Sequence, residues 1–308
     1  MLKHTRYIIG DLWSMTRALF ISRSLKQLNY LMCRSYYGRP RELLSALLCR
    51  LAPRPSGYAG VDVSEEVERL RVEGYALLDG VCPPELAARL FRELEHIPCK
   101  DPYRPELGAL RGDRLPPETH VAQLEREALI RSKDVMDLAN HPKLLAIVSQ
   151  ALNAKPTVLV TSWWSSFAGG EPEAAELFHR DKDDWRFLKV FIYLTDVDQR
   201  SGPHVFVPRS HTHRGLEFRR QRRYTDEEVS AFYGDGCQRV FLGPAGTTLI
   251  ENTYGLHKGL PVQEGRRLML QFTYSLFPLL YAPERPEVSA AELSGAYDPH
   301  INRVHVQP

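Results

Sequence analysis

The sequence predicts an α+β fold, in which a double-stranded β-helix, or jelly roll, forms the core and a helical N-terminal region packs outside it. Two observations support this prediction. Several segments before residue 157 carry apolar residues at three- and four-residue spacing, which is typical of amphipathic helices. From about residue 157 to 280, β-branched and aromatic runs alternate with turns, and roughly six to eight such strands fit two antiparallel sheets packed face to face.

The first 58 residues form a basic arm. They carry ten Lys and Arg against two acidic residues, a net charge of +8 in a chain of net +2, so the other 250 residues carry −6. Apolar residues recur at helical spacing between residues 5 and 50, and Pro53-Arg-Pro-Ser-Gly indicates a linker. We therefore expect a basic helical arm over 1–58 and a single domain over 59–308. The arm can pack on the core, contact a second subunit, or lie on an anionic membrane surface.

The segment from 61 to 152 is predicted to be mainly helical. Ser64 suits the N-cap of a helix whose first turn is acidic, and a short strand follows this helix. A second helix begins in the run Cys82-Pro-Pro-Glu-Leu. Residues 100–128 are rich in Pro, Arg and Asp, and we interpret them as a long loop. Pro142 then begins a helix that ends at about Leu152.

Three residues in the strand-rich part form a candidate metal site. Side chains two apart on a strand point to the same face, so His179 and Asp181 would present an imidazole and a carboxylate side by side. A third ligand can come from another strand, and His257 follows the strand-like run 246–250. Asp183 shares the same face, but it would lie roughly 13 Å from His179 along a strand. Two histidines and one carboxylate are the facial triad of non-haem Fe(II) oxygenases.

Four blocks in a fixed order extend this pattern: residues 70–80, His179-Arg-Asp, residues 195–211, and the stretch from His257 to Arg266. Together they resemble the phytanoyl-CoA dioxygenase-like family of Fe(II)/2-oxoglutarate-dependent dioxygenases. The resemblance implies a cupin-like jelly roll in which His179, Asp181 and His257 bind Fe(II), with 2-oxoglutarate as cosubstrate and O2 as oxidant. It also implies a structural role for the turn that contains His211.

The resemblance further implies that an Arg about ten positions after the last ligand binds the distal carboxylate of 2-oxoglutarate, so Arg266 and Arg267 are candidates. Adjacent strand residues face opposite ways, and only one of the two can point into the site. Arg266 shares its face with the more apolar set of following residues, and we choose Arg266. Gly259 occupies a position where a hydroxyl often assists, and Lys189 or Tyr193 could replace that contact.

The function implied is hydroxylation of an unactivated C–H bond in a small molecule, such as a lipid, an acyl group or a biosynthetic intermediate, with release of succinate and CO2. Desaturation, cyclisation and epimerisation use the same ligands and stay open. Halogenases of this fold replace the carboxylate ligand by a small residue, so Asp181 favours hydroxylation. The alternative is a non-oxidative cupin-like protein that binds a ligand through its metal. Such a protein has no need of a cation for a dicarboxylate.

Composition limits the location and partners of the protein. The five cysteines are odd in number and show no CxxC spacing, which argues against a disulfide framework or a structural zinc site. We therefore expect a reducing, cytoplasmic compartment. No run of about eighteen apolar residues is present, so no membrane span is expected. Nothing in the sequence resembles a nucleic-acid-binding module, and we expect a small-molecule substrate.

Overall fold

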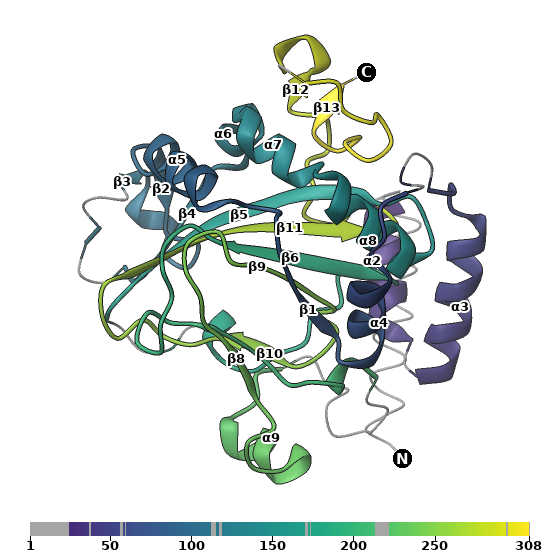
Figure 1. Cartoon of the computed structure of the whole chain (residues 1–308), viewed down its shortest axis with the longest axis horizontal. Coiled ribbons are helices and arrows are strands. Elements are labelled where there is room, and N and C mark those ends of the chain that lie inside the picture. Colours follow the sequence, from purple (N-terminus) through teal and green to yellow (C-terminus); the bar gives the residue numbers. More distant parts are fainter. Residues whose placement is uncertain are drawn as a thin grey trace.

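The computed structural model describes residues 25–36, 38–55, 58, 60–111, 115–116, 119–169, 172, 174–212, 222–293 and 295–307. The helical pattern predicted before residue 25 lies outside these residues. Figure 1 shows a large sheet across the middle of the molecule, with helices along one side and short strands on the other.

The large sheet contains eight strands, and all its pairings are antiparallel. Its longest strands are central, and they contain many of the β-branched and aromatic residues that favour strands. The strand order is β1 (Tyr75–Leu78), β9 (Thr248–Glu251), β6 (Phe187–Tyr193), β11 (Arg266–Ser275), β5 (Thr157–Phe167), β4 (Val121–Leu124), β2 (Pro98–Lys100) and β3 (Leu110–Arg111).

A small sheet faces the large one. Its order is β10 (His257–Gly259), β7 (His204–Phe206) and β8 (Arg239–Phe241). Phe191 and Met269 of the large sheet pack in one cluster with Phe206 and Phe241 of the small sheet. Two antiparallel sheets that share an apolar interior form a sandwich, and this confirms the predicted jelly-roll core. A separate parallel pair joins β12 (Val288–Ser289) to β13 (Val306–Gln307).

The sheet reaches further back in the chain than the predicted core of 157–280. Strand β1 pairs with β9, and β4 pairs with β5, so both segments add to the large sheet. The loop predicted over 100–128 was therefore wrong in part, because it contains β3, β4 and the 3₁₀ turn η2 (Pro105–Leu107). Strands β3 and β4 are only two and four residues long, which is too short for a clear alternation, and β4 joins the large sheet by pairing with β5.

Helices pack along the outer face of the large sheet and at one end of it (Figure 1). They are α2 (Leu25–Ser35), α3 (Gly38–Leu51), α4 (Ser64–Val72), α5 (Pro84–Leu94), α6 (Arg126–Arg131), α7 (Lys133–Ala139) and α8 (Pro142–Leu152). Leu268, Leu270 and Phe272 of β11 share one core cluster with residues of these helices, including Leu90 and Leu144. Alternate residues of β11 therefore point to the helices, and the residues between them point into the sandwich.

Helix ends follow the predicted signals in most places. Pro142 begins α8, which ends at Leu152 as predicted, with Asn153 in the left-handed conformation after it. A separate helix, α9 (Asp226–Tyr233), begins with a capping box formed by Thr225 and Glu228. At α4 the prediction was wrong by one residue, since Ser64 is the first helical residue and makes no side-chain cap. No helix in the described part of the chain is long and apolar enough to cross a membrane.

Candidate active site

The three predicted ligands meet because two segments run antiparallel beside the small sheet. His179 and His257 form a bridge with reciprocal backbone hydrogen bonds of 3.0 and 3.1 Å. Two residues further, the Asp181 amide donates to the Thr253 carbonyl at 2.9 Å. The ligand atoms offered by His179, Asp181 and His257 all lie within 4.8 Å of one another. The structure therefore brings together residues that are 78 positions apart at most.

The hydrogen bonds of the two imidazoles leave the correct atoms free for a metal. The Nδ1 atom of His179 lies 2.8 Å from the Leu177 carbonyl, and that of His257 lies 3.1 Å from the Gly255 carbonyl. A carbonyl only accepts, so Nδ1 carries a proton in both rings, and Nε2 is the nitrogen that is left to bind a metal. The Nε2 atoms lie 3.8 and 3.3 Å from the two carboxylate oxygens of Asp181. This donor set fits a divalent transition metal.

Charge states in the site also suit a metal. Burial and the nearby His257 hold the pKa of His179 well below its ordinary value, so its imidazole is neutral. Burial by itself would raise the pKa of Asp181, but Lys189 and His257 hold that pKa well below its ordinary value, so the carboxylate is ionised. Neutral imidazoles and an ionised carboxylate are the protonation states that ligate Fe(II).

Lys189 of β6 is the nearest cation to the ligands. Its Nζ lies 2.7 Å from Asp181 and 3.1 Å from Asp183, and Asp183 also accepts a hydrogen bond from the Tyr281 hydroxyl at 3.0 Å. Asp183 is thus paired with Lys189 and is not part of the ligand group. The Lys189 ammonium compensates the buried carboxylates, which would otherwise be costly to hold in the interior.

A cavity of about 440 Å³ opens on the ligand group. It lies between the two sheets, and its lining includes all three candidate ligands together with Lys189, Phe191, His204, Gly259, Arg267, Met269 and Tyr281. Arg223 and Tyr103 also line it. The cavity therefore joins the candidate metal site to one buried guanidinium, that of Arg267.

The choice of Arg266 was wrong about the direction of its side chain. Arg266 points to the outer face of the sheet, where it lies 3.2 Å from Glu95 and stacks on the Phe91 ring at 4.6 Å. Arg267 is 5% exposed and points into the cavity. The prediction assumed that the more apolar face of β11 is the interior. In this fold the outer face is the more apolar one, because helices cover it and the inner face borders a polar cavity.

Arg267 is held by few partners. Its Nη1 donates to the Gly202 carbonyl, and its Nη2 lies 3.2 Å from the Ser166 hydroxyl. Its Nε has no hydrogen-bond partner among the described residues, and none of the ion pairs among those residues includes Arg267. A Cβ on Gly259 would lie 3.3 Å from Nη1, so glycine there leaves room for the guanidinium. The Glu176 carboxylate, which also lines the cavity, pairs with His120 at 3.1 Å and acts on Arg267 only from beyond salt-bridge distance. A buried guanidinium that forms no salt bridge favours an anionic ligand in this cavity.

The two polar residues proposed to replace a hydroxyl at position 259 already have partners. The Tyr193 hydroxyl donates to the Phe241 carbonyl at 3.1 Å and accepts from the His204 amide at 3.0 Å. Lys189 is bound to Asp181 and Asp183. Ser166 of β5 contacts Arg267 instead. Sequence reasoning missed Ser166, because nothing along β5 distinguishes a serine that faces the cavity.

His204 is a further residue in the lining of the cavity. Its ring stacks near that of His257, with the centroids 5.8 Å apart, and its Nε2 lies 2.8 Å from the Glu251 carboxylate. Burial raises the pKa of Glu251 to about 8. Glu251 was missed as well, although a carboxylate ending an apolar strand is the signal that could have found it. By contrast His211, which lies 3.2 Å from the Arg71 carbonyl, supports a turn as expected.

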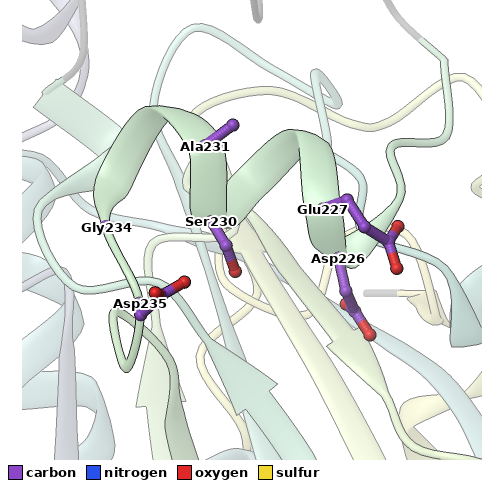
Figure 2. A pocket seen from close by; sticks show the side chains of 6 residues that line it. All are labelled: Asp226, Glu227, Ser230, Ala231, Gly234 and Asp235. Atoms are coloured by element: carbon purple, nitrogen blue, oxygen red, sulfur yellow. The ribbon is translucent and has the colours of Figure 1, made fainter.

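A second hollow lies on α9, away from the ligand group. Figure 2 shows its lining, in which the carboxylates of Asp226, Glu227 and Asp235 stand along one helix and the turn after it. Asp226 already pairs with Lys258 at 2.6 Å. Within the described part of the chain, the group of His179, Asp181 and His257 is the one cluster of at least three such residues that could hold a metal.

Several solved structures are similar to this one. The structure is similar to the α-ketoglutarate-dependent carbocyclase SnoK from nogalamycin biosynthesis, with 17% identity, 71% of this chain and 86% of the other covered, and a TM-score of 0.49. It is also similar to HygX from Streptomyces hygroscopicus, solved with nickel and 2-oxoglutarate (16% identity, 77% and 95% covered, TM-score 0.47). A third similar structure is AviO1 from Streptomyces viridochromogenes Tue57, with 22% identity, 70% of this chain and 96% of the other covered, and a TM-score of 0.43.

The search of curated proteins found no match. The family model described as phytanoyl-CoA dioxygenase (PhyH) matches residues 70–263, which is more than half of the chain and includes all three candidate ligands. The chain therefore belongs to the phytanoyl-CoA dioxygenase family.

Proposed function

We propose that this protein is an Fe(II)- and 2-oxoglutarate-dependent oxygenase that hydroxylates an unactivated C–H bond of a small molecule, with release of succinate and CO2. The observation that carries the proposal is one cavity that holds both a two-histidine, one-carboxylate group and a buried guanidinium that forms no salt bridge among the described residues. The family membership supports the same conclusion.

In this proposal His179, Asp181 and His257 are the metal ligands. Each histidine would bind through Nε2, because its Nδ1 proton is already donated to a backbone carbonyl. Three protein ligands leave further positions open for the keto acid and O2. The bound Fe(II), with 2-oxoglutarate and O2, supplies oxidising power that no side chain has.

Arg267 binds the distal carboxylate of 2-oxoglutarate. A planar guanidinium can offer two parallel N–H groups to a carboxylate, and burial strengthens that interaction. Gly259 gives the side chain its space, and Ser166 fixes its Nη2. Phe191 and Met269 are apolar neighbours in the cavity lining and would exclude water from the middle of the cosubstrate.

The substrate would enter from the part of the cavity lined by Tyr103 and Arg223. Arg223 is exposed, so a substrate with an anionic group is favoured over a neutral one. The presence of Asp181 as third ligand favours hydroxylation over halogenation. A cupin that only binds a ligand is the less favoured alternative, because it gives no reason to bury Arg267 without a salt-bridge partner.

An anaerobic titration tests the proposal. Purified full-length protein is loaded with Fe(II) and then titrated with 2-oxoglutarate, and the visible metal-to-ligand charge-transfer band is recorded. We expect the band in the wild type and its absence in His179→Ala. A wild type that holds iron but gives no band on addition of 2-oxoglutarate would refute the oxygenase and leave the ligand-binding alternative.

A further inference from the structure

Helices α2 and α3 lie outside the segment matched by the family, yet α3 contacts both segments that carry the candidate ligands, and α2 contacts one of them. The central residue is Arg41 of α3, which is only 6% exposed. No ion pair among the described residues includes Arg41. A buried guanidinium without a carboxylate partner is costly, so its other contacts must account for its position.

The first set of contacts holds the chain just after Asp181. Arg41 Nη2 donates to the Asp184 carbonyl at 2.6 Å and to the Trp185 carbonyl at 3.2 Å. Its Nη1 donates to the Cys33 carbonyl at the end of α2. One guanidinium thus joins two arm helices to the segment that leads from Asp181 into β6. Only Arg has enough planar donors to bridge three carbonyls in this way.

Asn29 of α2 holds the same segment from another side. Its Nδ2 donates to the Asp184 carboxylate at 3.0 Å, and its Oδ1 accepts from Trp185 Nε1 at 2.9 Å. Asp184 also accepts from the Phe277 amide at 2.9 Å. The arm therefore holds both Asp184 and Trp185, and the segment just after β11 also holds Asp184.

The second set of contacts reaches the segment before His257. The Arg41 guanidinium lies 4.8 Å from the centroid of the Tyr254 ring, and Arg180 lies 5.7 Å from that ring. Arg180 also donates to the Tyr254 carbonyl. Arg180 stands between the ligands His179 and Asp181 in the sequence. The stack of Arg41, Tyr254 and Arg180 therefore connects α3 with all three ligand positions.

We propose that Arg41 is a positioning residue of the metal centre, and that the arm formed by α2 and α3 sets the spacing of the two ligand segments. This inference rests on the proposed function, because it needs the three residues to bind a metal. Residues that support metal ligands from outside typically change metal affinity by about 10- to 100-fold when they are removed. We expect a loss of metal affinity of this size when Arg41 is replaced.

The test measures binding of Co(II), a redox-stable probe of the site, to full-length apoprotein by its visible absorption. The test variant is Arg41→Gln, and the matched control is Arg39→Gln, an exposed residue of the same helix. Tyr254→Leu removes the aromatic face while keeping an apolar side chain of similar bulk. We expect Arg41→Gln to weaken Co(II) binding at least about tenfold, Tyr254→Leu to weaken it less, and Arg39→Gln to leave it unchanged.

Each outcome has a separate meaning. The double variant Arg41→Gln/Tyr254→Leu should bind Co(II) little more weakly than Arg41→Gln alone, because both changes break one stack. Circular dichroism and hydrogen exchange distinguish a local change at 182–185 and 252–257 from global unfolding. If a folded Arg41→Gln or Tyr254→Leu variant binds Co(II) with wild-type affinity, this inference is overturned but the proposed function is not. A wild type that binds no Co(II), and no Fe(II), would overturn the proposed function too.

Discussion

Replacing Arg267 is the sharpest test of the cosubstrate site, because its neighbour Arg266 is a matched control one residue away. Arg267→Leu removes the cation and keeps an apolar side chain in the cavity. A hydrogen bond to a charged group contributes about 1.5–3 kcal/mol, and a bidentate carboxylate contact contains two of them. The loss is therefore at least about 3 kcal/mol, which corresponds to a Kd for 2-oxoglutarate raised roughly 150-fold.

The assay is titration of the Fe(II)-loaded variants with 2-oxoglutarate under anaerobic conditions. Arg267→Lys keeps a point charge without the planar fork, and we expect it to weaken binding about tenfold. Arg266→Leu should bind 2-oxoglutarate within about twofold of wild type, since its partners Glu95 and Phe91 are on the outer face. Normal binding in Arg267→Leu together with weak binding in Arg266→Leu would refute the assignment. Metal affinity without 2-oxoglutarate serves as the internal control, because Arg267 is not a ligand.

Three further predictions concern stability and metal binding. Gly74 has φ +90°, and a Cβ there would lie 2.5 Å from His211 Nδ1. In a urea titration, Gly74→Ala should therefore lower the free energy of unfolding by about 3 kcal/mol. The control is Gly80→Ala, where φ is positive but the space is open, and it should lower that free energy by only about 1 kcal/mol. Burial raises the pKa of Asp184 from its ordinary value of 3.8 to about 6. The folded state therefore holds this proton more tightly than the unfolded state. The resulting stabilisation is fully present below about pH 4 and is lost as the pH rises through 6. Asp184→Asn should therefore lose most stability relative to wild type at low pH, and the difference should shrink by roughly 3 kcal/mol by pH 7; a difference independent of pH would show that the carboxyl does not titrate in this range. Co(II) at a hundredfold excess over its Kd should stabilise the wild type by about 2.7 kcal/mol in a thermal melt but leave His257→Ala unchanged, and equal stabilisation of both would place the metal elsewhere.

The ligand group could be predicted from sequence because its geometry is mostly local. The pair His179 and Asp181 needs only an extended backbone, and the family's ordered blocks supply His257. Predicting which side chains of β11 face the cavity needed more than local information. Whether odd or even residues face inward depends on what covers each face, and here the helices make the outer face the apolar one. Nothing within residues 266–275 carries that information.

Long-range contacts of the arm were also beyond sequence reasoning. Its helical character was predictable for residues 25–51, since apolar residues recur with helical spacing. That Arg41 is buried under Trp185 and Tyr254 follows only from the tertiary fold, because a lone Arg in a basic helix is ordinarily a solvated residue. The positive charge of the arm thus has at least one role inside the protein, in addition to any role at a surface.

The charges in the cavity imply that metal and cosubstrate bind cooperatively. Lys189 is already compensated by Asp181 and Asp183, whereas Arg267 forms no salt bridge among the described residues and is compensated only from a distance by Glu176. A divalent metal alone adds positive charge to a cavity that already holds the unpaired Arg267. A dicarboxylate alone adds negative charge beside Asp181. Bound together, the two neutralise each other, which lowers the cost of burying either one. We therefore expect 2-oxoglutarate to tighten Co(II) binding in the wild type, and to tighten it much less in Arg267→Leu.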